Sequence, residues 1–387
     1  ALMEQLSEGK VNIDRNTKGW MEAEMGRGEG KQMALKAHHS KHLSKVHATM
    51  DGTVSQNISI PENIQDAIST LSLDVLSIDK SHELGPLVIV GTACLTRENL
   101  LGKFFALGEE PKDGGGPMAS RFSKFLALVE GLYEEKNPYH NAYHAADVTN
   151  SVSTFLSGEV GSSLSVLETV STLLAAAIHD VGHTGHNNQY HVVTRSDLAL
   201  LYNDQSVLEM YHLATGFRVL QDASANCLAH LSREDYGICR SLIIDLVLAT
   251  DMSKHFSLVT QFNLGYEQQN KEEEKEFPLL LKLQCIIKTA DIGHCAKPVD
   301  LHVKWSMAIS EEFFRQGDEE REKGLPVAPH MDRQTACIPK GQIGFINFVV
   351  KPLYEICAKI SPDTCNLAVE NLEASLKHWK AEAEALH

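Results

Sequence analysis

Two histidines spaced four residues apart carry the first chemical signal in this sequence. They are His140 and His144, in the stretch Tyr-His-Asn-Ala-Tyr-His. Asn137 and Pro138 just before them predict the start of a helix, because asparagine is a favoured N-cap residue and proline is tolerated at the first helical position. Side chains four residues apart on a helix share one face, with Cβ atoms within about 6 Å. The two imidazoles are therefore expected to reach a single site.

Two further stretches bring acidic groups to the ends of apolar segments. The run 171–178 leads directly into His179 and Asp180, and the segment 279–290, whose apolar residues form a predicted buried stripe, leads into Asp291. Buried carboxylates are costly unless another charge compensates them. A divalent cation bound by carboxylate oxygen and imidazole nitrogen would compensate them, and zinc, manganese and magnesium all suit such donors. No HExxH motif occurs, so a zinc-protease site of that type is not indicated.

The elements that would position these residues are helices. Apolar residues recur at helical spacing from about Leu71 onward, with few of the alternating patterns that mark strands. The sequence therefore predicts an all-α fold, a compact multi-helix bundle. Residues 1–65 are rich in Gly, Lys, Glu, His and Ser and lack sustained apolar periodicity. We expect an N-terminal extension over 1–65, either a linker or partly helical, and one folded domain over 66–387.

Composition restricts the classes of partner. The chain of 387 residues has a formal net charge of −16, which argues against binding a nucleic acid polymer, because phosphates are met by Lys and Arg. No apolar run approaches the roughly 20 residues of a membrane-spanning helix, and no secretory signal pattern opens the chain. The 8 cysteines form no CxxC pair, so neither a thiolate zinc site nor a disulfide scaffold is indicated. We expect an intracellular protein, cytoplasmic or peripheral to membranes.

Taken together, these motifs resemble a known family. The ordered set of His140, His144, the His179–Asp180 pair and Asp291 is similar to the HD superfamily of metal-dependent phosphohydrolases. Longer stretches narrow the resemblance to the catalytic domain of class I cyclic nucleotide phosphodiesterases, over about residues 80–380. These stretches are Tyr-His-Asn-Ala-Tyr-His-Ala-Ala-Asp-Val (139–148), His-Asp-Val-Gly-His-Thr-Gly (179–185), Leu-Ala-Thr-Asp-Met-Ser-Lys-His (248–255), Glu-Glu-Phe-Phe-Arg-Gln-Gly-Asp (311–318) and Gly-Gln-Ile-Gly-Phe-Ile (341–346).

The resemblance implies hydrolysis of 3′,5′-cyclic nucleotides, cAMP and also cGMP, to 5′-nucleoside monophosphates. The first metal, zinc, would be held by four side chains, those of His144, His179, Asp180 and Asp291. Asp180 would also bridge to a second metal, magnesium or manganese, and the two ions would activate a hydroxide that attacks the phosphate. His140 would then be the general acid that protonates the departing O3′, rather than a ligand.

The same resemblance assigns supporting and substrate-binding residues. His183 and Glu209 would contact metal-bound water and orient the ligands. Gln342 would recognise the base, because a carboxamide that rotates can match either adenine or guanine. The other side chains expected at the substrate are Phe345 and Ile309, one on each face of the base, with His294 and Tyr139. Ordinary core packing is the alternative role for Phe345 and Ile309.

Two positions depart from the family pattern. Gly182 replaces the commoner second aspartate of His-Asp-Val-Asp-His, so a carboxylate near the metals is missing and the affinity for the second metal is expected to differ. His294 stands where members that prefer cAMP carry asparagine, whereas some dual-specificity branches carry histidine. This second departure points to hydrolysis of both nucleotides.

Two other functions stay open at this point. A metal site of this kind could serve another phosphoester, such as a nucleoside monophosphate, and a catalytically silent sensor of cyclic nucleotides would share the base pocket. Gln342 and its stacking partners argue against the first alternative. The complete ligand set together with His140 argues against the second. Regulatory domains are expected outside this chain, and the sequence indicates no oligomeric state.

Overall fold

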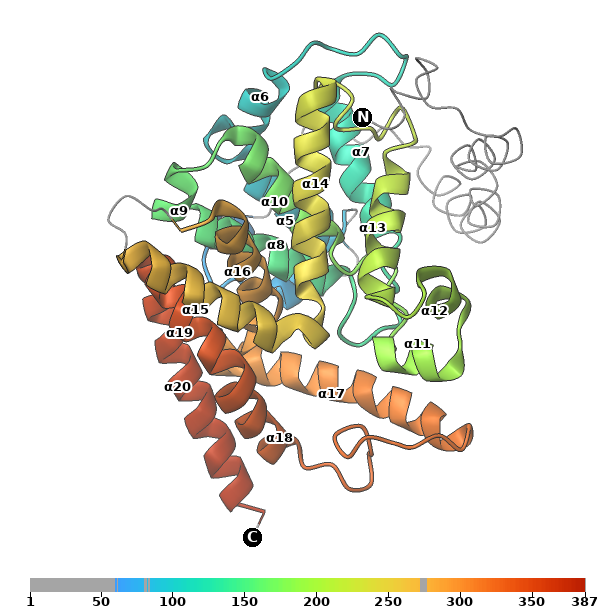
Figure 1. The fold of residues 1–387 in the computed structure, drawn as a ribbon, viewed down its shortest axis with the longest axis vertical. Helices are drawn as coiled ribbons and strands as arrows, with labels where there is room; N and C mark the ends of the chain where they lie inside the picture. The colour runs from blue at the N-terminus through green and yellow to red at the C-terminus, as the bar shows by residue number, and fades with distance from the viewer. Residues whose placement is uncertain (1–59, 61, 80–81, 83, 272–276, 387) are drawn as a thin grey trace, which may run out of the picture. The chain divides into compact units, whose positions relative to one another are not determined.

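The computed structural model describes residues 60, 62–79, 82, 84–271 and 277–386. They fall within one compact unit that spans Val54–His387. The predicted N-terminal extension, 1–65, lies almost entirely outside the described residues. The described part of the chain is built from helices and contains no β-strand (Figure 1). The predicted all-α fold is therefore confirmed.

The helices differ widely in length. The α-helices follow one another in this order: α4 (Glu62–Ala67), α5 (Pro86–Thr96), α6 (Leu100–Phe105), α7 (Met118–Glu130), α8 (Ala142–Leu156), α9 (Glu159–Ser162), α10 (Val166–Ile178), α11 (Asn188–Thr194), α12 (Asp197–Tyr202), α13 (Val207–Val219), α14 (Arg233–Thr250), α15 (His255–Lys271), α16 (Leu279–Asp291), α17 (Val299–Glu322), α18 (Ile338–Phe345), α19 (Lys351–Ile360) and α20 (Pro362–Glu384). Short 3₁₀ turns are η1 (Val75–Ser77), η2 (Arg97–Asn99), η3 (Met252–Lys254) and η4 (Gly293–Ala296), and η5 (Ile346–Val350) is a π-helical turn.

Helices α8, α10 and α16 form the part of the core that carries the four predicted metal ligands. α8 packs against α5, α10 and α16, and α14 packs against α10 and α16. Figure 1 shows α14 running alongside α13 in front of α10. A capping box of Ser165 and Glu168 fixes the start of α10, and every residue from Val170 to Ile178 is buried. The next residues along the chain, His179 and Asp180, are therefore delivered at the end of a core helix.

The helix that carries Asp291 matches its prediction in extent but not fully in burial. α16 has Pro278 as its N-cap residue and ends at Asp291. Leu279 and Leu280, expected in the buried stripe, are 37% and 39% exposed. Burial on this helix begins at Leu283. The expectation for the first turn was wrong because folded proteins keep much apolar surface, so apolar type alone does not ensure burial.

Helix α8 begins four residues later than the sequence predicts. Its N-cap residue is Asn141, not Asn137. The side-chain amide of Asn137 instead donates to the carbonyl oxygens of His140 at 3.0 Å and of His183 at 2.8 Å. The second of these is a tertiary contact, which the local sequence does not contain, and it holds Asn137 outside the helix. The prediction that His140 shares a helical face with His144 is therefore wrong.

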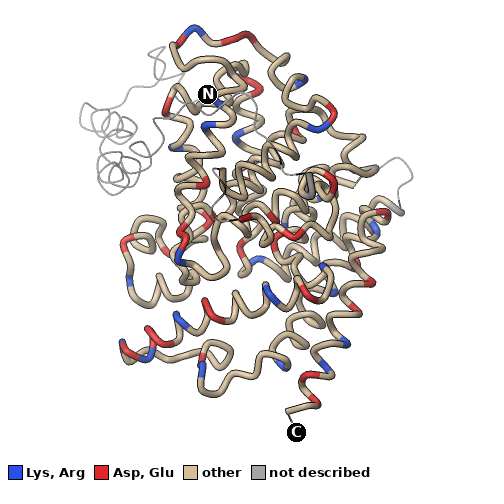
Figure 2. The backbone as a smooth tube through the Cα atoms, turned by 180° about the vertical axis from the view of Figure 1, so that it is seen from behind, with Lys and Arg blue, Asp and Glu red and all other residues tan. Residues whose placement is uncertain are grey.

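Three expectations from composition can be compared with the described part of the chain. None of its helices combines the length and the apolar character that crossing a membrane would require. All 8 cysteines are free thiols, and seven of them are buried. Lys and Arg are interspersed with Asp and Glu along the backbone rather than gathered on one element (Figure 2).

Candidate active site

The four residues predicted as metal ligands converge from three helices. His144 lies in the first turn of α8, His179 and Asp180 directly follow α10, and Asp291 is the last residue of α16. Each residue offers one ligand atom, and these atoms all lie within 4.8 Å of one another. The histidines are buried and the aspartates are half-buried. Residues far apart in the sequence thus form one cluster.

The spacing of these atoms matches the edges of a tetrahedron around zinc. Zinc bonds of about 2.0–2.1 Å in tetrahedral geometry place neighbouring ligand atoms about 3.3 Å apart. His179 Nε2 lies 3.1 Å from Asp180 Oδ2 and 3.4 Å from Asp291 Oδ1. His144 Nε2 lies 3.5 Å and 3.2 Å from the same two oxygens, and the two Nε2 atoms are 3.2 Å apart. These residues fit a single four-coordinate ion.

The orientation and charge of His179 also suit a cation. Its Nδ1 donates to the carbonyl oxygen of Ala176 at 2.8 Å, so Nε2 is the atom that faces the cluster. Burial disfavours a charged imidazole, yet the carboxylates of Asp180 and Asp291 outweigh burial and raise the pKa of His179 well above its usual value. The carboxylates therefore draw positive charge into the cluster. A bound divalent ion would supply that charge in place of the proton.

The second oxygen of Asp180 faces another imidazole. Asp180 Oδ1 lies 3.6 Å from Nε2 of His212, on α13. His212 Nδ1 donates to the carbonyl oxygen of Val181 at 2.9 Å, and burial lowers the pKa of His212 to about 4. The facing Nε2 therefore carries a lone pair. Two facing acceptors need a cation or a hydrogen-bond donor between them, so this side of Asp180 is suited to a second ion or its water.

Glu209, predicted to support the metals, lies on α13 one turn before His212. Its carboxylate accepts hydrogen bonds from the side-chain amide of Asn188 at 3.0 Å and 3.3 Å. Burial, together with the nearby charges of Asp251 and Asp180, raises the pKa of Glu209 to about 7. A cation beside Asp180 would favour the ionised form of Glu209.

His140 lies beside the cluster in an ion pair with Glu312, which projects from α17. His140 Nδ1 donates to Glu312 Oε1 at 2.5 Å, and the backbone N–H groups of Tyr139 and His140 both donate to Oε2 at 3.0 Å. Burial alone would lower the pKa of His140, but the charge and hydrogen bond of Glu312 outweigh it and raise the pKa to about 9. His140 Nε2 lies 3.9 Å from Asp180 Oδ2. A protonated imidazole therefore stands at the edge of the ligand cluster.

His183 belongs to a stack of imidazoles rather than to the four-residue cluster. Its ring stacks on His140 with a centroid distance of 3.9 Å and on His212 at 5.7 Å. His183 Nδ1 accepts a hydrogen bond from the backbone N–H of Gly185 at 3.1 Å. Burial and the neighbouring charge of His140 hold the pKa of His183 well below its usual value. A neutral His183 thus keeps its proton on Nε2 and separates His140 from His212.

The residues predicted to hold the base lie on two C-terminal helices. Ile309 is on α17, and Gln342 and Phe345 are on α18; all three side chains are half-buried. Gln342 Oε1 is shielded from solvent and has no hydrogen-bond partner among the described residues. Buried acceptors are normally paired. An unpaired one is therefore available to a ligand that brings a donor.

His294 takes part in a hydrogen-bond chain that starts at Trp379. The indole of Trp379 can only donate, and it donates to His302 Nε2 at 2.6 Å. Burial lowers the pKa of both His302 and His294, so each neutral ring carries one proton. The proton of His302 is therefore on Nδ1, which donates to His294 Nδ1 at 3.1 Å, and His294 keeps its own proton on Nε2. His294, Cys295 and His302 lie close enough together to offer ligands to a metal. In both imidazoles, however, these hydrogen bonds occupy the lone pair that a metal would need.

Tyr139 packs behind the ligand cluster. Its ring centroid lies 4.5 Å from that of His144 and 5.4 Å from that of Trp305. The residue is 5% exposed, and burial raises the pKa of its hydroxyl well above the usual value. In this position Tyr139 restrains the His144 ring.

The sequence did not point to Glu312 or His212. Glu312 belongs to one of the stretches that carry the family resemblance, but no role was assigned to it. A usable signal lies on α17, where Glu312, Gln316 and Glu320 recur every four residues and are all buried. A polar stripe on the buried side of a helix requires partners. His212 follows Glu209 by three residues, the spacing that places two side chains on one helical face.

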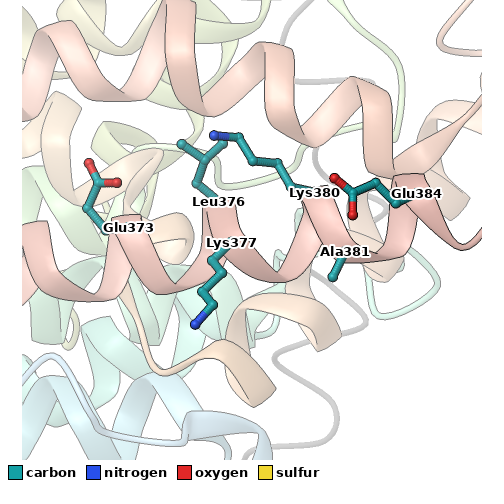
Figure 3. Close-up of a pocket in the computed structure, with 6 residues that line it drawn as sticks. All are labelled: Glu373, Leu376, Lys377, Lys380, Ala381 and Glu384. Atoms are coloured by element: carbon teal, nitrogen blue, oxygen red, sulfur yellow. The ribbon is translucent and has the colours of Figure 1, made fainter.

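A surface hollow of about 350 Å³ lies elsewhere, along one side of α20 (Figure 3). Its lining consists of Glu373, Leu376, Lys377, Lys380, Ala381 and Glu384. None of these is a predicted site residue. Glu373 already pairs with Lys351 at 2.6 Å. The hollow therefore adds nothing to the site around the His and Asp cluster.

The helical fold and the His and Asp cluster are those of a metal-dependent phosphohydrolase. Comparison with known proteins specifies the family. The model of the 3′5′-cyclic nucleotide phosphodiesterase family matches residues 139–372. The chain belongs to this family. It is 37% identical over 359 residues to the dual specificity calcium/calmodulin-dependent 3′,5′-cyclic nucleotide phosphodiesterase 1C of Mus musculus, covering 89% of this chain and 49% of the relative. The 1B enzyme of the same species is 38% identical over 290 residues, covering 74% of this chain and 51% of the relative. The chain thus spans about half the length of the curated relatives it matches.

Solved structures agree with this family. The chain resembles the phosphodiesterase domain of the Salpingoeca rosetta rhodopsin phosphodiesterase, with a TM-score of 0.71 and 27% sequence identity, over 86% of this chain and 97% of that one. A second structure, of the phosphodiesterase domain of the RhoPDE fusion protein from the same choanoflagellate, has a TM-score of 0.71 and 29% identity. It covers 84% of this chain and 99% of the other.

Substitution of a residue in the four-residue cluster should remove metal. Substitution in the cluster of His294, Cys295 and His302 should not. Asp291→Asn keeps the shape of the side chain but removes the charge that four-coordinate binding uses, so zinc retained after dialysis should fall by about 10-fold or more. Cys295→Ala is the matched control and should retain the wild-type zinc content, measured by plasma mass spectrometry. Loss of zinc in Cys295→Ala with full retention in Asp291→Asn would place the ion at the cluster of His294, Cys295 and His302 instead.

Proposed function

We propose that this chain hydrolyses the 3′,5′-cyclic nucleotides cAMP and cGMP to 5′-nucleoside monophosphates, with His140 as the general acid. The observation that carries the proposal is the position of the protonated His140, with Nε2 3.9 Å from an oxygen of the ligand cluster and Nδ1 paired with Glu312. A proton donor next to a metal cluster suits an in-line displacement at phosphorus. A protein that only bound the nucleotide would not require this pair.

Two ions of different kind suit the two sides of Asp180. The four-residue cluster has two nitrogen and two oxygen donors at tetrahedral spacing, which favours zinc. The other oxygen of Asp180 faces His212 Nε2 at 3.6 Å, and a hard ion that keeps several waters, such as magnesium or manganese, is proposed for that side. When bound, such ions supply Lewis acidity that acidifies water and neutralises charge on the phosphate.

His140 would act on the leaving group. An O3′ alkoxide is a poor leaving group at neutral pH, and protonation by a positioned acid removes this obstacle. Nε2–H of His140 is the available donor, because Nδ1–H is held by Glu312. After the transfer, Nδ1–H still donates to Glu312, so the ring keeps its orientation and can be reprotonated from water.

Base recognition is proposed for Gln342, with Phe345 and Ile309 on the faces of the ring. The unpaired Oε1 of Gln342 supports this role, since adenine and guanine both present an N–H donor. His294 would contribute its Nε2–H, and Tyr139 would act indirectly by restraining His144. The relatives named above are described as dual specificity enzymes, which supports the choice of both nucleotides as substrates.

Purified protein supplied with zinc and magnesium should convert both cAMP and cGMP to the 5′-monophosphates, measured by chromatography. His140→Ala should lower kcat by about 100-fold or more, the contribution of a positioned acid, with zinc content unchanged. His186→Ala is the matched control, because the side chain of His186 is as exposed as that of His140, at 20%, and pairs with Glu319 instead. Intact substrate after prolonged incubation with wild-type protein would refute the activity, and a parallel loss of zinc in His140→Ala would make His140 a ligand.

The alkaline limb of the pH profile should report the His140–Glu312 pair. Glu312, with smaller contributions from Asp180 and Asp291, raises the pKa of His140 to about 9. Cations bound by the two aspartates would lower this pKa, so the acid form is lost, and turnover falls, as the pH rises toward that value. Glu312→Gln removes the charge, which should move the alkaline limb roughly one to three pH units toward neutral. Glu311→Gln, at an exposed carboxylate paired with Arg333, should leave the limb in place. An unchanged limb in Glu312→Gln would mean that another group controls the alkaline side.

A further inference from the structure

Gly182 and Tyr211 meet in a contact that is tight for any side chain at position 182. Gly182 has φ +76°, a left-handed conformation that favours glycine. A Cβ atom built there would lie 3.0 Å from Cε1 of Tyr211 and 3.3 Å from its hydroxyl oxygen. Carbon atoms in ordinary contact lie about 3.5–4.0 Å apart. The ring of Tyr211 therefore packs directly on the backbone of the turn.

The two elements that touch here carry opposite sides of the proposed second metal pocket. The turn that contains Gly182 also carries Asp180, two residues before it. Helix α13, which contains Tyr211, also carries Glu209 and His212. Asp180 Oδ1 and His212 Nε2 face each other across 3.6 Å. Any change in the distance between the turn and the helix changes the spacing of these groups.

Two other close approaches join the same elements. His212 Nδ1 donates to the carbonyl oxygen of Val181, the residue before Gly182, at 2.9 Å. One turn farther along α13, a Cβ atom at Gly216 would lie 2.7 Å from Cδ1 of Ile178, so the helix backbone approaches the end of α10 closely. The hydrogen bond fixes direction, whereas the ring of Tyr211 is a rigid spacer between backbone and helix. The Gly182 contact lies next to the His212 hydrogen bond, one residue away along each element.

We propose that Tyr211 is a positioning residue for the second metal pocket. Its ring, packed on Gly182, sets the separation between Asp180 on the turn and His212 and Glu209 on α13. This inference rests on the proposed function, which places a hard divalent ion on that side of Asp180. It also accounts for the glycine at position 182, because a side chain there would press on the ring and strain the left-handed backbone.

The contact can be tested by measuring Mn²⁺ binding to zinc-loaded protein from the free Mn²⁺ signal in electron paramagnetic resonance, together with zinc content and Tm. Gly182→Ala should weaken Mn²⁺ binding by about 10-fold or more, as expected when groups behind the ligands are disturbed, with zinc retained. Tyr211→Ala should weaken it as well. Tyr211→Phe, which keeps the ring, should bind Mn²⁺ within about twofold of the wild type, because the ring and not the hydroxyl is the spacer.

A matched glycine separates the contact from backbone strain. Gly324 has φ +68° and no atom within 4 Å of a built Cβ, so Gly324→Ala carries a similar conformational cost without a collision. It should lower Tm and leave Mn²⁺ binding unchanged. In the Tyr211→Ala background, Gly182→Ala should have a much smaller further effect on Mn²⁺ binding than in the wild type, because the ring it collides with is gone.

Three results would overturn the proposal. They are unchanged Mn²⁺ binding in Gly182→Ala, an equal effect of Gly182→Ala with and without the Tyr211 ring, and equal losses in Tyr211→Phe and Tyr211→Ala. If the wild type retained zinc but bound no Mn²⁺, the proposed second ion would fail instead. In that case the Tm values of the two single variants and the double variant would still test whether Gly182 and Tyr211 are coupled.

Discussion

Two carboxylates and two imidazole nitrogens lie close enough together to bind one ion. The site depends on a positive charge that compensates the two carboxylates. Oxygens of Asp180 and Asp291 lie 3.1–3.5 Å from Nε2 atoms of His144 and His179. Without a cation, protons on the imidazoles compensate the carboxylates, as the raised pKa of His179 indicates. The core helices α8, α10 and α16 each end or begin at this cluster, so packing energy from the whole core holds its donors together.

The surrounding residues adjust the protonation of groups that the cluster alone would not control. Glu312 pairs with His140 and keeps it positive, whereas burial keeps His183 and His212 neutral. Trp379 fixes the proton positions of His302 and His294 through a chain of hydrogen bonds. Closely spaced histidines thus have different charges because each has a different partner. This separation of roles is what allows one histidine to donate a proton beside others that do not.

The clustering of the proposed ligands could largely be predicted from the sequence, because its signals are local. An apolar run that ends in His179 and Asp180, and a helix that ends in Asp291, were recognisable from the spacing of apolar residues. The start of α8 could not be predicted, since two asparagines compete as N-caps and the choice depends on the bond from Asn137 to the carbonyl oxygen of His183. Glu312 and Trp379 act through contacts with residues distant in the sequence, which periodicity does not encode. Gly182 was recognised as a departure, but its partner Tyr211 emerged only from the packing of α13.

We propose that one zinc ion is bound by two histidines and two aspartates where three helices meet. X-ray absorption at the zinc edge, on protein carrying one zinc per chain, would identify the atoms that bind the ion. We predict a first shell of nitrogen and oxygen at about 2.0–2.1 Å, with outer-shell scattering from two imidazole rings and no sulfur. A sulfur contribution at about 2.3 Å would place the ion at the cluster that contains Cys295, and would contradict the account.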